Sequence, residues 1–132
     1  MLMPSVSRYM TRQPWTIPSR SSLADAHAVM RAHEIRHLPV VDDGKLVGIV
    51  TDRDLRLFES LGGLRSGRVR DAMTEPVFSV KPEEGIDEVV RTMSERKYGS
   101  AVVMTNAGAV EGIFTAVDAC RALAEILVRV TA

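Results

Sequence analysis

Two threonine–aspartate pairs with the same spacing are the residues of this sequence best suited to chemistry. Thr51 and Asp54 lie in the stretch GIVTDRD, and Thr115 and Asp118 lie in the stretch GIFTAVD. An ionised carboxylate offers two acceptor oxygens and no donor, so it can accept both hydroxyls of a vicinal diol. A threonine hydroxyl can donate or accept beside it. The chemistry open to these pairs is therefore hydrogen bonding to the hydroxyl groups of a ligand.

Each pair is expected where a strand ends and a helix begins. The N–H groups and the dipole of a helix N-terminus favour a nearby phosphate, and Gly48 and Gly112 leave room for a ligand to approach the backbone. The same spacing is also that of a helix capping box. Ser22 and Asp25 show this pattern at another expected helix start. The motif alone therefore leaves two interpretations open, a ligand contact or a helix cap.

The chain contains two copies of one pattern. MTRQPWTIPSRSSLADAHAVM (residues 10–30) matches MTEPVFSVKPEEGIDEVVRTM (73–93), and RHLPVVDDGKLVGIVTDRD matches GSAVVMTNAGAVEGIFTAVD. Each copy has the order strand, helix, strand, strand, helix. One copy has a sheet face and little to cover it. We therefore expect an α/β (α+β) fold of two β-α-β-β-α repeats, residues 1–62 and 63–132, packed as a pseudo-two-fold pair with a linker at about 60–70.

Local signals predict the elements of each copy. A helix is expected from Leu23 to Glu34 with Ser22 as its N-cap, and another along the apolar stripe of residues 86–93. Asp43-Gly44 predicts a hairpin turn in copy one, and residues 106–108 predict the turn of copy two. The last helix should follow Thr115 and carry one apolar face, made of Leu123, Ile126, Leu127 and Val130.

Composition excludes several classes of protein. Of 132 residues, 45% are hydrophobic, and 17 basic residues balance 17 acidic ones. This indicates a globular chain with no overall field for nucleic acid. The single cysteine, Cys120, excludes an internal disulfide framework. We see no signal peptide and no run of about 20 apolar residues. A cytoplasmic protein that contacts neither nucleic acid nor membrane is the expectation.

Signals for catalysis and metal binding are weak. No Ser/His/Asp order, Walker-type phosphate loop or facing carboxylate pair appears, so we do not expect an enzyme or a required cofactor. His27, His33 and His37 lack partners at ligand spacing, so no metal site is expected. Cys120 is expected to be a small buried residue, and Trp15 to pack in the core.

The paired motifs carry a family resemblance. Met-Thr followed by Pro, the run RHLPVVDDGKLVGIVTDRD and the copy-two GIFTAVD together resemble a tandem CBS-domain module, the Bateman module named after cystathionine β-synthase. The resemblance implies a disc-like pair of repeats. It also implies that an adenine nucleotide (AMP, ADP or ATP) or a related adenosyl compound binds in the clefts between them. In this family the Thr and Asp of the strand-exit motif face the ribose.

The resemblance also implies the composition of the two clefts. The first would contain Thr51, Arg53 and Asp54, completed by Val77, Phe78, Tyr98, Gly99 and Ser100. The second would contain Thr115 and Asp118, completed by Trp15, Thr16, Ile17, Ile35, Arg36 and His37. Arg53 could reach a phosphate, so the Asp54 cleft is expected to be the better nucleotide site. In the second cleft Arg36, His37 or Arg121 would have to meet that charge.

Two functions are weighed. The first is a stand-alone regulatory sensor that binds an adenosyl ligand and signals to an effector protein whose identity is unknown. The second is an interaction scaffold with no bound nucleotide, in which both aspartates only cap helices. The resemblance further implies a homodimer, and the helices near residues 23–30 and 86–93 would be its natural surfaces. The native ligand stays open, and S-adenosylmethionine, NAD-type compounds and cyclic dinucleotides remain candidates.

Overall fold

The chain folds into two compact units that do not coincide with the two sequence copies. A computed structural model describes residues 2–62 and 66–132, so residues 63–65 of the expected linker lie outside the described part. One unit consists of Pro14–Val77, and we call it the copy-one unit. The other combines Met1–Gln13 with Phe78–Ala132, and we call it the copy-two unit. Each unit is thus built mainly from one copy and completed by the opening segment of the other.

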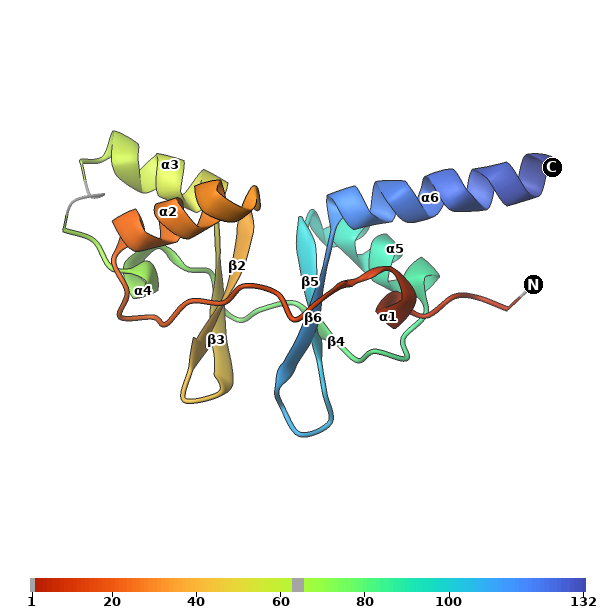
Figure 1. Cartoon of the computed structure of the whole chain (residues 1–132), viewed down its shortest axis with the longest axis horizontal. Coiled ribbons are helices and arrows are strands. Elements are labelled where there is room, and N and C mark those ends of the chain that lie inside the picture. The colour runs from red at the N-terminus through yellow and green to blue at the C-terminus, as the bar shows by residue number, and fades with distance from the viewer. Residues whose placement is uncertain (1, 63–65) are drawn as a thin grey trace. The chain divides into compact units, whose positions relative to one another are not determined.

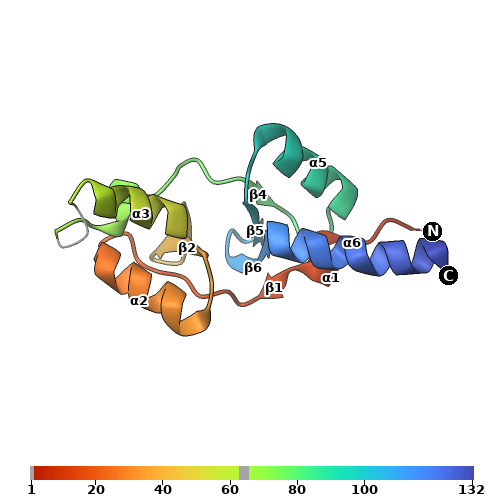
Figure 2. The same ribbon diagram turned by 90° about the horizontal axis from the view of Figure 1, so that it is seen from above.

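The copy-two unit is built around a four-stranded sheet (Figure 1). The strands run in the order β1-β6-β5-β4, where β5 and β6 form an antiparallel hairpin, β4 is parallel to β5 and β1 is antiparallel to β6. Helix α1 lies beside α6 (Figures 1 and 2). The elements are α1 Val6–Tyr9, β1 Thr11–Arg12, β4 Ser79–Val80, α5 Ile86–Arg96, β5 Ser100–Met104, β6 Val110–Thr115 and α6 Ala116–Thr131.

The copy-one unit repeats this plan with a shorter sheet. A hairpin of two antiparallel strands is flanked by two isolated bridges, a parallel one between Ile17 and Val40 and an antiparallel one between Ile49 and Thr74. These bridges lie where β4 and β1 pair in the other unit. Helices α2 and α3 lie side by side (Figure 2). The elements are α2 Leu23–His33, β2 His37–Asp42, β3 Lys45–Thr51, α3 Asp52–Ser60 and α4 Val69–Ala72.

Turns and caps follow the local signals of the sequence. Asp43 and Gly44 both have positive φ, 49° and 78°, as the hairpin turn between β2 and β3 requires. The hydroxyl of Ser22 accepts a hydrogen bond from the Asp25 N–H at 3.0 Å, which caps α2. Glu34 ends that helix in the left-handed conformation. The predicted hairpin turn, N-cap and helix are therefore confirmed.

Each unit has its own core. In the copy-one unit the apolar face of α2 is buried with the hairpin, and in the copy-two unit the apolar face of α5 is buried with α1 and the sheet. The apolar faces of α2 and α5 thus pack within their own units, and a dimer formed through these helices stays a prediction. These buried side chains are Leu23, Ala26 and Met30 on α2, and Ile86, Val89 and Met93 on α5.

The last helix begins directly after Thr115, as predicted, but most of its apolar face is not covered by the unit. Of its expected apolar face only Ile126 packs against the core, while Leu123, Leu127 and Val130 are more than half exposed. Cys120 is exposed as well, not buried. Helix α6 extends beyond the sheet (Figure 1), so its later turns have no apolar surface of the unit to cover. Within residues 2–62 and 66–132, neither this helix nor any other is long and apolar enough to cross a membrane.

The Met-Thr pair that opens each copy packs against a glycine of the other copy: Met73-Thr74 against Gly48, and Met10-Thr11 against Gly112. A Cβ atom built on Gly48 would lie 2.6 Å from the sulfur of Met73, and one built on Gly112 would lie 2.5 Å from the sulfur of Met10. The expectation that these glycines leave room for a ligand is therefore wrong, because a methionine side chain and the backbone beside it occupy that place. The glycine of each copy accommodates the Met-Thr pair of the other copy.

Candidate functional site

The first threonine–aspartate pair forms a complete capping box. Thr51 ends β3, its hydroxyl accepts from the Asp54 N–H at 3.1 Å, and its own N–H donates to Oδ2 of Asp54 at 2.9 Å. The carboxylate is thereby held beside the free N–H groups of the first turn of α3. No described residue donates to Oδ1 of Asp54, so this oxygen remains open to a ligand.

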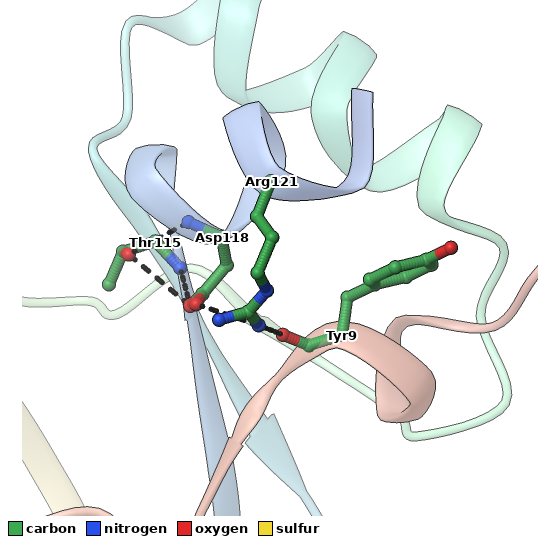
Figure 3. Close-up of polar contacts among 4 residues, drawn as sticks. All are labelled: Tyr9, Thr115, Asp118 and Arg121. Carbon is green, nitrogen blue, oxygen red and sulfur yellow. Dashed lines mark hydrogen bonds and ion pairs between the residues drawn. The ribbon is translucent and has the colours of Figure 1, made fainter. Parts of the chain in front are cut away.

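The second pair forms the same box with additional contacts (Figure 3). Oδ2 of Asp118 accepts from the Thr115 N–H at 2.9 Å and from the Thr115 hydroxyl at 3.2 Å. Arg121, one helical turn further along α6, lies with Nη2 3.3 Å from Oδ1 of the same carboxylate. The same Nη2 donates to the backbone carbonyl of Tyr9 at 2.9 Å. Asp118 is buried, with 5% of its surface exposed.

The two carboxylates therefore differ in the capacity that remains for a ligand. A carboxylate has about four lone-pair sites, two on each oxygen. Asp54 accepts one hydrogen bond, so both of its oxygens can accept a further hydroxyl. Asp118 accepts two hydrogen bonds on Oδ2 and pairs with Arg121 through Oδ1. A diol that contacts both carboxylate oxygens fits Asp54 without any rearrangement.

The segment before β2 lies against the Asp54 helix start. The carbonyl of Arg36 accepts from the Asp52 N–H at 2.9 Å, and His37 pairs with Thr51 across the hairpin. Burial lowers the pKa of His37, the positive charge of Arg36 acts in the same direction, and the Asp54 carboxylate opposes them. The predicted residues Arg36 and His37 are thus brought together with Thr51 and Asp54, while Ile35 packs against the core of the unit.

A surface depression lies along the first two turns of α3. Arg53, Asp54, Arg56 and Leu57 line it. Arg56 is paired with Asp52 at 2.7 Å, whereas Arg53 is exposed and has no ion-pair partner among the described residues. A guanidinium that lines the same depression as Asp54 suits an anionic group carried by the same ligand as a diol.

In the copy-two unit the segment before β5 has the equivalent position. The carbonyl of Gly99 accepts from the Ala116 N–H at 3.1 Å, and Ser100 pairs with Thr115. Tyr98 stacks on Phe78 with 5.1 Å between ring centroids. Gly99 and Ser100 therefore lie beside Thr115, and Tyr98 and Phe78 stack on each other within the same unit.

The segment around Trp15 belongs to the copy-one unit. Trp15 is 55% exposed and stacks on His33 with 3.8 Å between ring centroids, so the expectation that it packs in the core is wrong. Ile17 is buried in the core of the unit, so its side chain does not line a surface. Thr16 is exposed and Val77 is half-buried.

Residues 98–100 were predicted beside Asp54, and residues 35–37 beside Asp118. Inside its own unit, each of these segments contacts the threonine of its own copy. A grouping across the two units stays a prediction.

The contact between Arg121 and Tyr9 was not foreseen. The spacing of three residues between Asp118 and Arg121 on a helix was a signal for their ion pair. The Tyr9 carbonyl had no signal, because every residue carries a backbone carbonyl. Among the described residues, no three His, Cys, Asp or Glu side chains converge in a way that could hold a metal ion.

Comparison with known proteins identifies the same protein domain in both copies. CBS domains match residues 6–60 and 69–125. The inosine-5′-monophosphate dehydrogenase of Nitrosopumilus maritimus is 34% identical over 110 residues, which are 83% of this chain but 22% of that enzyme. The chain thus spans about a fifth of the length of this curated relative.

Two solved structures share the fold over nearly all of both chains. The CBS domain pair of protein MJ0100, in complex with 5′-methylthioadenosine and S-adenosyl-L-methionine, superposes with a TM-score of 0.87 at 29% identity, covering 94% of this chain and 98% of that one. CBSX2 in complex with AMP superposes with a TM-score of 0.80 at 29% identity, covering 92% and 97%. From its two matched repeats and this shared architecture, the chain belongs to the CBS-domain family and is a tandem CBS-domain pair.

Proposed function

We propose that this CBS pair is a regulatory sensor module that binds an adenosyl ligand and does not itself catalyse a reaction. The ribose hydroxyls of the ligand are held by Asp54 and Thr51. The single observation that carries the proposal is the capping box at the end of β3, whose Asp54 carboxylate keeps an open oxygen. A vicinal diol is what such a carboxylate recognises.

The ligand class follows from relatives and from local charge. Two similar CBS pairs were solved with 5′-methylthioadenosine, S-adenosyl-L-methionine or AMP, and all three contain an adenosyl group. Arg53 lines the same depression as Asp54 and can meet a phosphate. We therefore place AMP first among the candidates, with ADP, ATP and the two adenosyl sulfur compounds behind it.

Signalling requires that binding changes what the module presents to a partner. Ligand binding at Asp54 contacts the start of α3 and can stabilise one arrangement of the chain over another. The exposed apolar side chains of α6 are a surface on which a second copy or an effector protein can pack. A homodimer and an effector protein are therefore part of the proposal.

A thermal-shift panel tests the proposal. AMP, ADP, ATP, S-adenosylmethionine and 5′-methylthioadenosine are added to the wild-type chain, to Asp54→Asn and to Asp118→Asn. Asparagine keeps one carbonyl oxygen for the Thr51 N–H, so the cap survives, but it replaces the other oxygen by a donor that cannot accept a hydroxyl. A ligand at about 100 times its dissociation constant adds about 2.7 kcal/mol of stability.

The proposal expects stabilisation by at least one compound, which is lost in Asp54→Asn and kept in Asp118→Asn. Stabilisation that survives in Asp54→Asn would move the ribose away from Asp54. If no compound stabilises the folded chain, the sensor function is wrong. The interaction scaffold then explains the structure better, because capping alone accounts for both aspartates.

A further inference from the structure

Arg121 forms a bridge that has no equivalent in copy one. Its guanidinium joins the Asp118 carboxylate on α6 to the Tyr9 carbonyl at the end of α1 (Figure 3). Arg121 is the sixth residue after Thr115, and the sixth residue after Thr51 is Leu57. A leucine side chain cannot donate a hydrogen bond, so copy one lacks the group that makes this bridge.

The bridge occupies an oxygen that a diol needs. Oδ2 of Asp118 already accepts two hydrogen bonds from Thr115, and Oδ1 is approached by Arg121. One lone-pair site of about four then remains, whereas a diol that spans the carboxylate needs one on each oxygen. Oδ2 can accept a ribose hydroxyl only after the Thr115 hydroxyl turns away, and a ribose hydroxyl that approaches Oδ1 must compete with the Arg121 guanidinium for that oxygen.

Only one end of the bridge is exposed. The Arg121 side chain is 59% exposed, whereas the Asp118 side chain is 7% exposed. Without Arg121 the carboxylate would be a buried charge with no cation beside it. Its second anchor is a neutral carbonyl, which α1 brings in from the opposite end of the chain. Movement of α1 away from α6 would remove that anchor.

We propose that Arg121 is an intramolecular competitor that closes the Asp118 site to a ribose, so that the chain binds one adenosyl ligand, at Asp54. This rests on the proposed function. Leucine at position 57 leaves the Asp54 carboxylate open, and arginine at position 121 closes its counterpart. The two positions therefore set how many ligands one chain takes.

Exchanging the two residues tests the proposal. The number of ligands bound per chain is measured by isothermal titration calorimetry, with AMP and 5′-methylthioadenosine as probes, on wild type, Arg121→Leu, Leu57→Arg and the double variant Arg121→Leu/Asp118→Asn. Arg129→Leu is the matched control, because it removes an arginine from the same helix at a site that pairs with Glu125 and not with Asp118. Both Arg121 and Leu57 are exposed, so the single variants at these positions should fold.

We expect one ligand per wild-type chain, two in Arg121→Leu, and one again in the double variant. Leu57→Arg should weaken binding at Asp54 about tenfold or more, because it supplies the competing guanidinium. Arg129→Leu should behave as wild type. The wild-type site is assigned to Asp54 by its loss in Asp54→Asn.

Three results would overturn the proposal while leaving the sensor function intact. One is two equal sites in the wild type. Another is a single site that persists in Arg121→Leu together with unchanged affinity in Leu57→Arg. The third is weaker AMP binding in Arg121→Leu with no change for 5′-methylthioadenosine, because Arg121 would then be a phosphate contact. Absence of binding by either probe in all variants would refute the sensor function itself.

Discussion

Asp54 and Asp118 occupy the same position in two copies of one motif, yet they differ in how many hydrogen bonds they can still accept from a ligand. Both close a capping box at the end of a strand. Asp54 keeps an open oxygen and lines a depression together with the exposed Arg53, while Asp118 is buried and held by Thr115 and Arg121. The comparison teaches that a local motif sets the geometry of a carboxylate, whereas its surroundings decide whether the carboxylate can take a ligand.

The largest expected effect in a comparison of the two copies concerns the glycines that pack against the Met-Thr pairs. Gly112→Ala should lower the free energy of unfolding by about 2–3 kcal/mol and Gly48→Ala by about 1–2 kcal/mol. The new Cβ would lie 2.9 Å from the Thr11 carbonyl oxygen in the first case and 3.2 Å from that of Thr74 in the second. Backbone atoms cannot swing aside as the methionine sulfurs can.

Urea unfolding measures both losses. Gly108→Ala is a useful reference, because its φ of 85° strains any side chain although nothing crowds it. Equal losses at Gly48 and Gly112 would contradict the tighter crossing in the copy-two unit.

The threonine hydroxyls give a smaller effect. Thr51→Val removes an N-cap acceptor and should cost about 0.5–1 kcal/mol, and Thr115→Val should cost about 1–2 kcal/mol. The bond from the Asp118 N–H to the Thr115 hydroxyl is long, at 3.5 Å, but that hydroxyl also donates to the buried Asp118 carboxylate. Thr115→Val removes both of these bonds, including the donor to a buried charge, whereas Thr51→Val removes only the 3.1 Å bond from the Asp54 N–H. The Thr115 variant is therefore expected to lose more stability, although its capping bond is the longer one.

The same urea titration, with the capping variant Ser22→Ala as a third helix start, tests this order. A larger loss for Thr51→Val than for Thr115→Val would show that the cap, and not the additional donor, dominates.

The smallest expected effect is a pH dependence of stability that arises in copy one and not at the equivalent position of copy two. His37 pairs with Thr51, and Ser100, which does not titrate, pairs with Thr115. Burial lowers the pKa of His37 below its usual value of 6.5, although Asp54 opposes this. Between the lowered pKa and 6.5 the unfolded chain binds more protons than the folded chain. The contribution of His37 is therefore complete above 6.5 and is lost as the pH falls through that window.

His37→Gln should flatten this part of the stability curve. Unfolding by urea at about pH 7.5 and about pH 5.5 compares wild type with His37→Gln, and His27→Gln is the control for loss of an imidazole on α2. If the difference in stability between the two pH values is the same in His37→Gln as in wild type, His37 is not its source.

Much of the fold was predictable from the sequence because it depends on neighbouring residues. The Asp43-Gly44 turn, the Ser22 cap and the helix after each threonine are each decided within about one turn of chain. The repeat and the family resemblance followed from the same local patterns. The open or closed state of each aspartate did not, since both motifs share the threonine–aspartate spacing.

Only the tertiary structure decided which distant segments meet. The Met-Thr pair of each copy crosses the glycine of the other copy, although sequence alone assigns each pair to its own repeat. The bond from Arg121 to Tyr9 joins residues 112 positions apart through a backbone carbonyl, a group that side-chain types do not encode. Likewise, the exposed face of α6 depends on where the sheet ends. The sequence by itself determined the caps, turns and helices, because these depend on near neighbours, whereas contacts between distant segments depend on the path of the whole chain.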